Sequence, residues 1–177
     1  MNHRPPRLRT ALSQGAGVDL LELSARYLEE YLDKIDHCLA TLDDEQIWWR
    51  PNPESNSIGN LVLHLEGNLT QWLLSGLGGQ AFTRHRSEEF RADRTRTGAE
   101  LRRALPPVVE GCRAVLEGLT EAELAVEHDI QGYRIDGLGI VVHAVEHMSY
   151  HTGQIVAFAK LLEGGGAIDF YPQHAAE

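Results

Sequence analysis

The chain has 177 residues, of which 42% are hydrophobic and 24% are charged, and this is the composition of one globular domain with a core of ordinary size. Its 26 acidic and 16 basic residues give a formal net charge of −10. Because an acidic chain repels nucleic-acid phosphates and anionic lipid headgroups, we expect neither nucleic acid nor a membrane among its partners.

The N-terminal residues 1–17 contain arginines but no apolar run behind them, so the hydrophobic core of a signal peptide is missing. No other segment approaches the roughly 20 apolar residues that a membrane span needs. Cys38 and Cys112 lie far apart and form no CxxC pair, so we expect two buried free thiols. These features predict a cytoplasmic protein with a flexible N-terminal tail over residues 1–17.

Apolar residues recur at three- and four-residue steps over about residues 18–42, which predicts the first long helix. The residues on this stripe are Leu20, Leu23, Tyr27, Tyr31, Ile35 and Leu39. Pro51 and Pro53 then forbid a helix interior. A second helix is expected to begin near residues 55–57, whose small polar side chains suit N-capping, and to end at Gly76.

An arginine-rich segment follows the second helix and runs to about Thr97. Seven of the 16 basic residues are arginines between Arg84 and Arg103, and acidic neighbours partly cancel their charge. We expect a solvated connection here. The alternative is that one or two of these arginines bind a carboxylate of an anionic cosubstrate.

Thr97 and Glu100 have the spacing of a capping box, which opens a third helix that ends near Leu119. The adjacent Pro106 and Pro107 predict a kink or a restart within it. After a second capping-box spacing at Thr120 and Glu123, the segment around Gln131-Gly132 fits either a small hairpin or an extended connection.

A fourth helix is expected from Asp136-Gly137 to the glycines at 164–166. Four amphipathic helices with hardly any strand signal predict an all-α fold, namely a four-helix bundle over residues 18–166 followed by a C-terminal tail over residues 167–177. Bundles of this kind hold metal ions on side chains that project from facing helices.

The fourth helix carries His143, His147 and His151 at four-residue steps, and side chains four apart lie one turn apart on the same side of a helix. If Val141 marks the centre of the buried stripe, His151 lies about 80° from it, His147 about 120° and His143 about 160°. His143 is therefore expected to point towards solvent. His147 and His151 lie on the flank of the stripe, where a bundle opens into a cleft.

The second helix offers His64, which also lies about 120° from its apolar stripe. One histidine from this helix and two from the fourth would supply three nitrogen ligands and leave a position open for water or substrate. The alternative is that all three are surface or packing histidines. Gln154 and Asn68 are expected either to orient a ligand or to pack in a neighbouring contact.

Other residues near the histidines are expected to have structural roles. These are Glu66, Glu146 and Tyr150 on solvated or packing faces, and Trp48 and Trp49 holding the loop over the end of the bundle. No GxSxG motif and no activated cysteine context indicate a serine or cysteine nucleophile, so no catalytic residue is assigned.

Two runs of sequence resemble the DinB-like superfamily, whose hallmark is a histidine in the second helix and an HxxxH pair followed by Gly-Gln in the fourth. The runs are 57–68 (SIGNLVLHLEGN) and 143–155 (HAVEHMSYHTGQI), and Trp49-Arg50-Pro51 extends the likeness. The resemblance covers roughly residues 18–165. It implies an up-down-down-up bundle, often a homodimer, with one divalent zinc, nickel or iron ion on His64, His147 and His151.

Some members of the DinB-like superfamily are thiol S-transferases, which use a low-molecular-weight thiol such as mycothiol or bacillithiol. Another member is a mycothiol-dependent maleylpyruvate isomerase. A metal-dependent thiol S-transferase acting on a small molecule is therefore the expected function. Two alternatives stay open, a metal-dependent hydrolase and a non-enzymatic, metal-stabilised binding protein. The last would need a further protein ligand to close the site, and His143 is the nearest candidate in the sequence.

Overall fold

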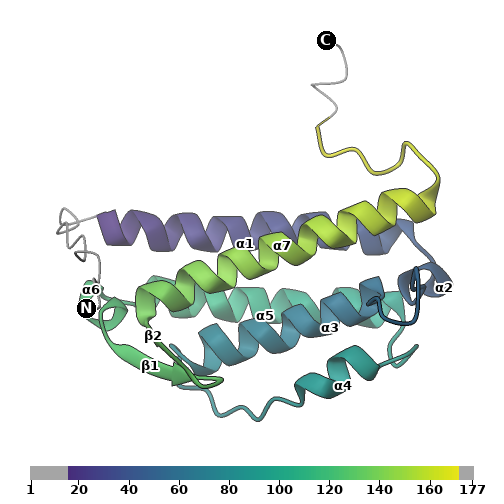
Figure 1. Ribbon diagram of the computed structural model, residues 1–177. Coiled ribbons are helices and arrows are strands. Elements are labelled where there is room, and N and C mark those ends of the chain that lie inside the picture. The colour runs from purple at the N-terminus through teal and green to yellow at the C-terminus, as the bar shows by residue number, and fades with distance from the viewer. Residues whose placement is uncertain (1–15, 172–177) are drawn as a thin grey trace, which may run out of the picture.

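The computed structural model describes residues 16–171, in which four long helices lie side by side (Figure 1). They are α1 (Ala16–Thr41), α3 (Ile58–Leu69) with its continuation as the π-helix η1 (Thr70–Ser75), α5 (Gly98–Gly118) and α7 (Gly137–Glu163). The shorter elements are α2 (Asp44–Ile47), α4 (Arg86–Arg91), α6 (Glu121–Leu124), β1 (Glu127–Ile130) and β2 (Tyr133–Asp136). Most of the N-terminal tail predicted over residues 1–17 lies outside the described residues, as do residues 172–177 of the predicted C-terminal tail.

The bundle has the up-down-down-up topology. Helix α1 packs against α5 and α7, and α3 packs against the same two helices, so α1 and α3 are diagonal partners. Figure 1 shows α1 and α7 running in one direction and α3 and α5 in the other. The all-α four-helix bundle expected from the sequence is confirmed, and the two-stranded antiparallel hairpin is the only sheet among residues 16–171.

Residues 76–97, here called the crossover segment, connect two helices that run in parallel. Because α3 ends at one end of the bundle and α5 begins at the other, this segment must return along the whole bundle. It carries α4, which packs against α3 on the way (Figure 1). The topology thus places an arginine-rich stretch along the outer side of the second helix.

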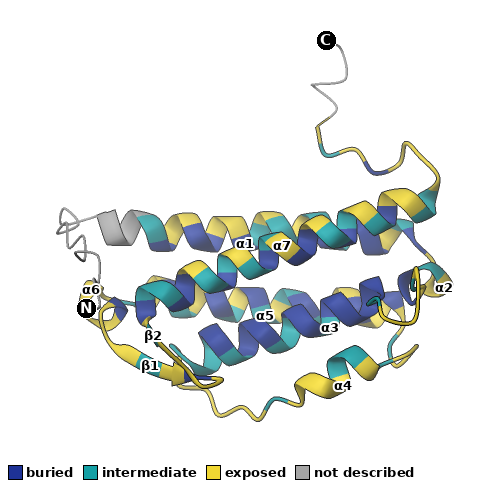
Figure 2. Ribbon diagram, in the orientation of Figure 1, coloured by how far each residue is buried: buried dark blue, intermediate teal, exposed yellow. Residues whose placement is uncertain are grey.

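The apolar stripes meet in one core, as the dark blue inner faces of the helices in Figure 2 show. The caps expected from the sequence are present. Ser57 caps α3 by accepting a hydrogen bond from the backbone N–H of Asn60, and Thr97 caps α5 in a capping box with Glu100. Helix α7 ends at Gly164, whose φ of 84° is the left-handed conformation that terminates many helices.

Two local expectations are decided by the structure. Helix α5 runs unbroken through Pro106 and Pro107, so the expected restart is wrong, and its buried residues at 101, 105 and 109 keep the helical period across the prolines.

The segment around Gln131-Gly132 is a hairpin. Its two turn residues have φ values of 55° and 78°, as a type I′ turn requires, and β1 pairs with β2 in a register that places Ile130 opposite Tyr133.

The two cysteines are free and buried, as expected. Burial raises the pKa of the Cys38 thiol to about 11 and that of Cys112 to about 12, so neither forms the thiolate of a reactive cysteine near neutral pH. Within residues 16–171, no helix combines the length and the apolar character of a membrane span.

Candidate metal centre

His64 on α3 meets His147 and His151 on α7 inside the bundle. The ring centroid of His64 lies 5.0 Å from that of each α7 histidine, and those two rings are 4.5 Å apart. One potential ligand atom from each histidine lies within 4.8 Å of the other two, and the Nε2 atoms of His64 and His147 are 2.8 Å apart. Two nitrogens bound to one tetrahedral ion are roughly 3.4 Å apart, so this donor set fits a single divalent ion.

The helix packing explains why these three side chains converge. The four-residue step places His147 and His151 one turn apart on α7, and α3 packs against that same helix. His64 and His151 are buried, and His147 is half-buried at the edge of the group. The sequence predicted these three positions, and the structure brings all of them together.

Each of two imidazoles is held by a hydrogen bond at Nδ1. The Glu89 carboxylate lies 2.9 Å from Nδ1 of His64, and Nη2 of Arg84 lies 3.0 Å from the same nitrogen. Because a carboxylate can only accept, the contact with Glu89 is a hydrogen bond when Nδ1 carries the hydrogen. The amide oxygen of Gln154 accepts from Nδ1 of His151 at 2.7 Å. Both contacts leave Nε2 as the lone-pair nitrogen, which is the arrangement that supports histidine ligation of a metal. Gln154 was among the residues expected to orient a ligand.

Arg84 of the crossover segment fixes Glu89. Its Nε and Nη2 atoms donate to the two carboxylate oxygens at 2.6 and 2.8 Å, and Nη2 also donates to the His64 carbonyl at 3.2 Å. The side chains of Arg84 and Glu89 are only 4% and 12% exposed. The expectation of a solvated connection is therefore wrong for this pair, because the crossover segment docks on α3 and buries it.

Glycine makes this docking possible at one position of α3. A Cβ atom at Gly67 would collide with the Glu89 carboxylate and would lie 3.0 Å from Nε of Arg84. No periodic pattern indicates Glu89 or Arg84, since both lie in a polar segment whose return path depends on the topology of the whole bundle.

Burial favours the neutral form of the two α7 histidines of the group, His147 and His151. Burial, followed by the charges of His151 and His64, lowers the pKa of His147 to about 3. Burial also lowers the pKa of His151, against the opposing effect of its hydrogen bond to Gln154. Burial acts to raise the pKa of Glu89, but hydrogen bonds from His64 and Arg84 outweigh it and lower that pKa. A neutral imidazole is the form that binds a metal, so burial prepares His147 and His151 as ligands.

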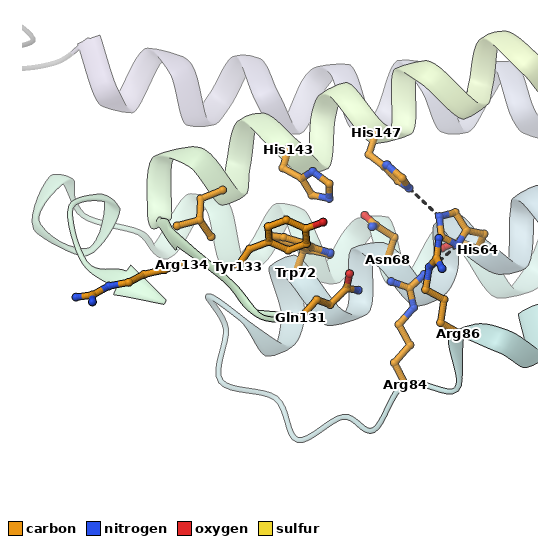
Figure 3. Close-up of a pocket in the computed structure, with 11 residues that line it drawn as sticks. His64, Asn68, Trp72, Arg84, Arg86, Gln131, Tyr133, Arg134, His143 and His147 are labelled. Atoms are coloured by element: carbon orange, nitrogen blue, oxygen red, sulfur yellow. Dashed lines mark hydrogen bonds between the residues drawn. The ribbon is translucent and has the colours of Figure 1, made fainter. Parts of the chain in front are cut away.

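A cavity of about 650 Å³ extends from His64 and His147 towards the hairpin. Figure 3 shows His143 and His147 reaching into it from α7, with Asn68 and Trp72 opposite. The rest of the lining is Arg84, Arg86, Gln131, Tyr133, Arg134 and Ile135. Three histidines at the end of a cavity leave room for a small molecule beside them.

The expectation that His143 points to solvent is wrong. Its ring packs on Trp72 with centroids 4.0 Å apart and stacks on His147 at 5.2 Å. The buried positions of α7 centre about 35° from Val141, towards Ile140, so the earlier angle for His143 was too large. The hairpin and η1 then cover the flank on which it lies. His143 nevertheless stands outside the group of three.

The other residues considered from the sequence have the structural contacts expected of them. Glu66 pairs with Arg96 at 2.7 Å, and Glu146 and Tyr150 are exposed. Trp48 is buried, and its indole N–H donates to the carbonyl of Arg96 at 2.8 Å, which ties the loop after α1 to the crossover segment.

The family model described as "protein of unknown function (DUF1572)" matches residues 16–168. The chain belongs to this DUF1572 family. The matched range covers the whole bundle, including all three clustered histidines and the crossover segment. No curated protein matches the chain.

Solved structures show that this DUF1572 chain has a DinB-like fold. A DinB-like protein from Bacillus subtilis has a TM-score of 0.64 and 20% identity, over 84% of this chain and 96% of that one. A DinB-like protein from Bacillus cereus gives 0.63 and 16%, over 80% and 89%. A conserved protein from Enterococcus faecalis gives 0.67 and 17%, over 81% and 97%. The DinB-like fold expected from the two histidine-containing runs is confirmed.

Proposed function

We propose that the protein holds one divalent metal ion on the Nε2 atoms of His64, His147 and His151 and acts as a metal-dependent thiol S-transferase on a small molecule. The convergence of three imidazoles at the end of a cavity carries this proposal. The hydrogen bonds at Nδ1 from two of them add to it, because they orient lone pairs towards a common point. The thiol part comes from the resemblance to DinB-like transferases.

The bound ion would coordinate the sulfur of a thiol and lower its pKa, which supplies a thiolate nucleophile near neutral pH. The chain contributes three neutral ligands, so that at least one coordination position faces the cavity. Glu89 and Gln154 hold the ligand rings in place. The cavity walls position the electrophile that accepts the sulfur.

Two features support thiol transfer over the alternatives. None of the residues that line the cavity is a carboxylate, so a hydrolase would lack an obvious general base beside the ion. A closed structural site would need a fourth protein ligand, and His143, the nearest candidate, packs on Trp72 and His147 without joining the group of three.

The test is transfer of a thiol to an electrophile by protein loaded separately with zinc, nickel or iron. Glutathione, cysteine and mercaptopropionate serve as thiols, and 1-chloro-2,4-dinitrobenzene serves as the acceptor, whose chloride leaves as the sulfur–carbon bond forms. We expect metal-dependent transfer by the wild type and by His85→Ala, an exposed control, and none by His147→Ala. Full transfer by a variant that has lost its metal would contradict the proposal.

A further inference from the structure

Beyond the three histidines, two rows of polar side chains line the cavity, one on α3 and η1 and one on α7. Asn68 and Trp72 follow His64 at four-residue steps on α3 and η1, and His143 precedes His147 by one turn on α7. The four-residue step puts each row on one helix face. Figure 3 shows the two rows facing each other across the cavity, with Trp72 and His143 at the end nearer the hairpin.

Three buried atoms in these two rows have no hydrogen-bond partner among the described residues. They are Oδ1 of Asn68, Nε1 of Trp72 and Nε2 of His143. The Asn68 and Trp72 side chains are each only 3% exposed. A buried polar atom without a partner is costly, and proteins rarely leave several of them side by side. Their shared position on the cavity wall indicates that a ligand supplies the missing hydrogen bonds.

The charge of the cavity is opposite to that of the protein. The lining includes three arginines and no carboxylate, although the chain as a whole has a net charge of −10. Arg84 is paired with Glu89, and Arg134 is paired with Glu127 and points away from the other labelled residues in Figure 3.

Arg86 is the remaining cation. Its guanidinium lies 4.9 Å from the ring centroid of Phe90, which itself packs on His64, and no carboxylate among residues 16–171 pairs with it. An unpaired guanidinium at a cavity without acidic side chains favours an anionic ligand. One unpaired guanidinium, with no lysine in the lining, balances the single charge of a carboxylate and not the roughly −1.5 to −2 charge of a phosphate monoester.

We propose that Asn68, Trp72 and Arg86 form a subsite that binds the carboxylate end of a small ligand whose other end faces the three histidines. The indole N–H of Trp72 donates to the carboxylate, and Arg86 neutralises its charge. Oδ1 of Asn68 accepts a hydrogen from a hydroxyl or amide group on the ligand, and His143 packs against Trp72 to fix the indole. The subsite rests on the proposed function only in assigning sulfur to the other end of the ligand.

The experiment compares carboxylates with their neutral amides by proton–nitrogen correlation NMR of the zinc-loaded protein. The probes are 3-mercaptopropionate with 3-mercaptopropionamide, and the sulfur-free pair butyrate with butyramide. The reporter is the indole N–H signal of Trp72, which is assigned by its loss in Trp72→Phe. Inorganic phosphate is titrated separately.

We expect both acids to shift the Trp72 signal and to bind at least about fivefold more tightly than their amides. Arg86→Gln should remove most of that preference, whereas Arg91→Gln, an exposed arginine on the same helix outside the cavity lining, should leave it unchanged. Equal binding of acids and amides would overturn the subsite, and so would an unmoved Trp72 signal.

Three further outcomes distinguish the subsite from binding at the zinc ion, from a phosphate site and from the thiol proposal. A preference for acids that survives Arg86→Gln would mean that the carboxylate binds the zinc ion alone, which overturns the subsite. Tighter binding of phosphate than of butyrate would overturn the proposal that the ligand is a carboxylate. If 3-mercaptopropionate binds no more tightly than butyrate while both acids keep their preference over the amides, the subsite stands and the thiol part of the proposed function fails.

Discussion

The two sides of the histidine group are built differently. On α7, His147 and His151 stand on one continuous helix, and Gln154, which holds His151, belongs to the same helix three residues later. On α3, His64 is held by Glu89, which lies 25 residues further along the chain and reaches it only because the crossover segment folds back. The α7 side is therefore organised locally, and the α3 side depends on docking of a separate segment.

This contrast implies that the α3 side is the more easily disturbed half of the metal centre. Helix α7 can lose a surface contact and still present two imidazoles at the same spacing. The orientation of His64 changes whenever Arg84 and Glu89 move. Substitutions on the two sides should consequently have unequal effects on metal affinity.

The largest effect is expected from removal of a ligand. His64→Ala takes away one of three donors, and we expect metal affinity to fall by more than about 100-fold, beyond the 10- to 100-fold that loss of a histidine's hydrogen-bond partner typically costs. His143→Ala removes a histidine of the same cavity that is not in the group of three and should keep nearly full affinity. Competition with a chromophoric chelator measures both. Equal losses in the two variants would show that the ligand set is misassigned.

Glu89→Gln should weaken metal binding by roughly 10- to 100-fold, because Nδ1 of His64 loses its carboxylate acceptor. The same change leaves Arg84 buried without a counter-charge, which should destabilise the fold by about 3 kcal/mol. Gln154→Ala on the locally organised side should weaken binding by about 10-fold at most. Chelator competition measures the loss of metal affinity, and urea unfolding measures the loss of stability. If Gln154→Ala weakens metal binding more than Glu89→Gln does, the α3 side is not the more easily disturbed half.

Two helical glycines offer a matched pair. Alanine at Gly67 would displace Glu89, so we expect a loss of about 1–3 kcal/mol in the free energy of unfolding together with weaker metal binding. Gly153 lies on the exposed face of α7 with nothing within 4 Å of an added Cβ, and Gly153→Ala should stabilise the protein by about 0.5–1 kcal/mol. If Gly67→Ala left both stability and metal affinity unchanged, docking of the crossover segment would not matter for the site.

A further effect concerns pH and the metal-free protein. The unfolded chain protonates His147 near its ordinary pKa of about 6.5, whereas the folded chain does so only near a pKa of about 3. Stability from the neutral imidazole is then fully present above about pH 6.5 and is lost as pH falls towards about 3. Urea midpoints measured across this range should decline less steeply for His147→Gln than for the wild type. Identical slopes would argue against a buried neutral His147.

Much of this molecule follows from patterns within single helices. The apolar stripes, the small polar residues at 55–57 and the capping box at Thr97 predicted the bundle, and the HxxxH step predicted that His147 and His151 share one face. These features are local, because the helix period fixes them over a few residues.

The features that the sequence did not predict are those that arise between segments. Glu89 and Arg84 look like solvent-exposed charges until the parallel arrangement of α3 and α5 forces their segment back along the bundle. A solvent-facing His143 follows only if Val141 alone marks the centre of the α7 stripe. The buried residues of α7 centre nearer Ile140, and the hairpin, whose existence the sequence leaves open, covers that flank. Helical geometry alone could not reveal a cavity between elements.

The most direct measurement is the bound metal of untagged protein by native mass spectrometry and elemental analysis, with the wild type beside His147→Ala and the exposed control His85→Ala. The proposed centre predicts about one zinc, nickel or iron ion per chain in the wild type and in His85→Ala, and little in His147→Ala, because three imidazoles hold a single ion. A wild type that remains empty after loading with each of these metals would contradict it, and so would a His147→Ala variant that keeps its full metal content.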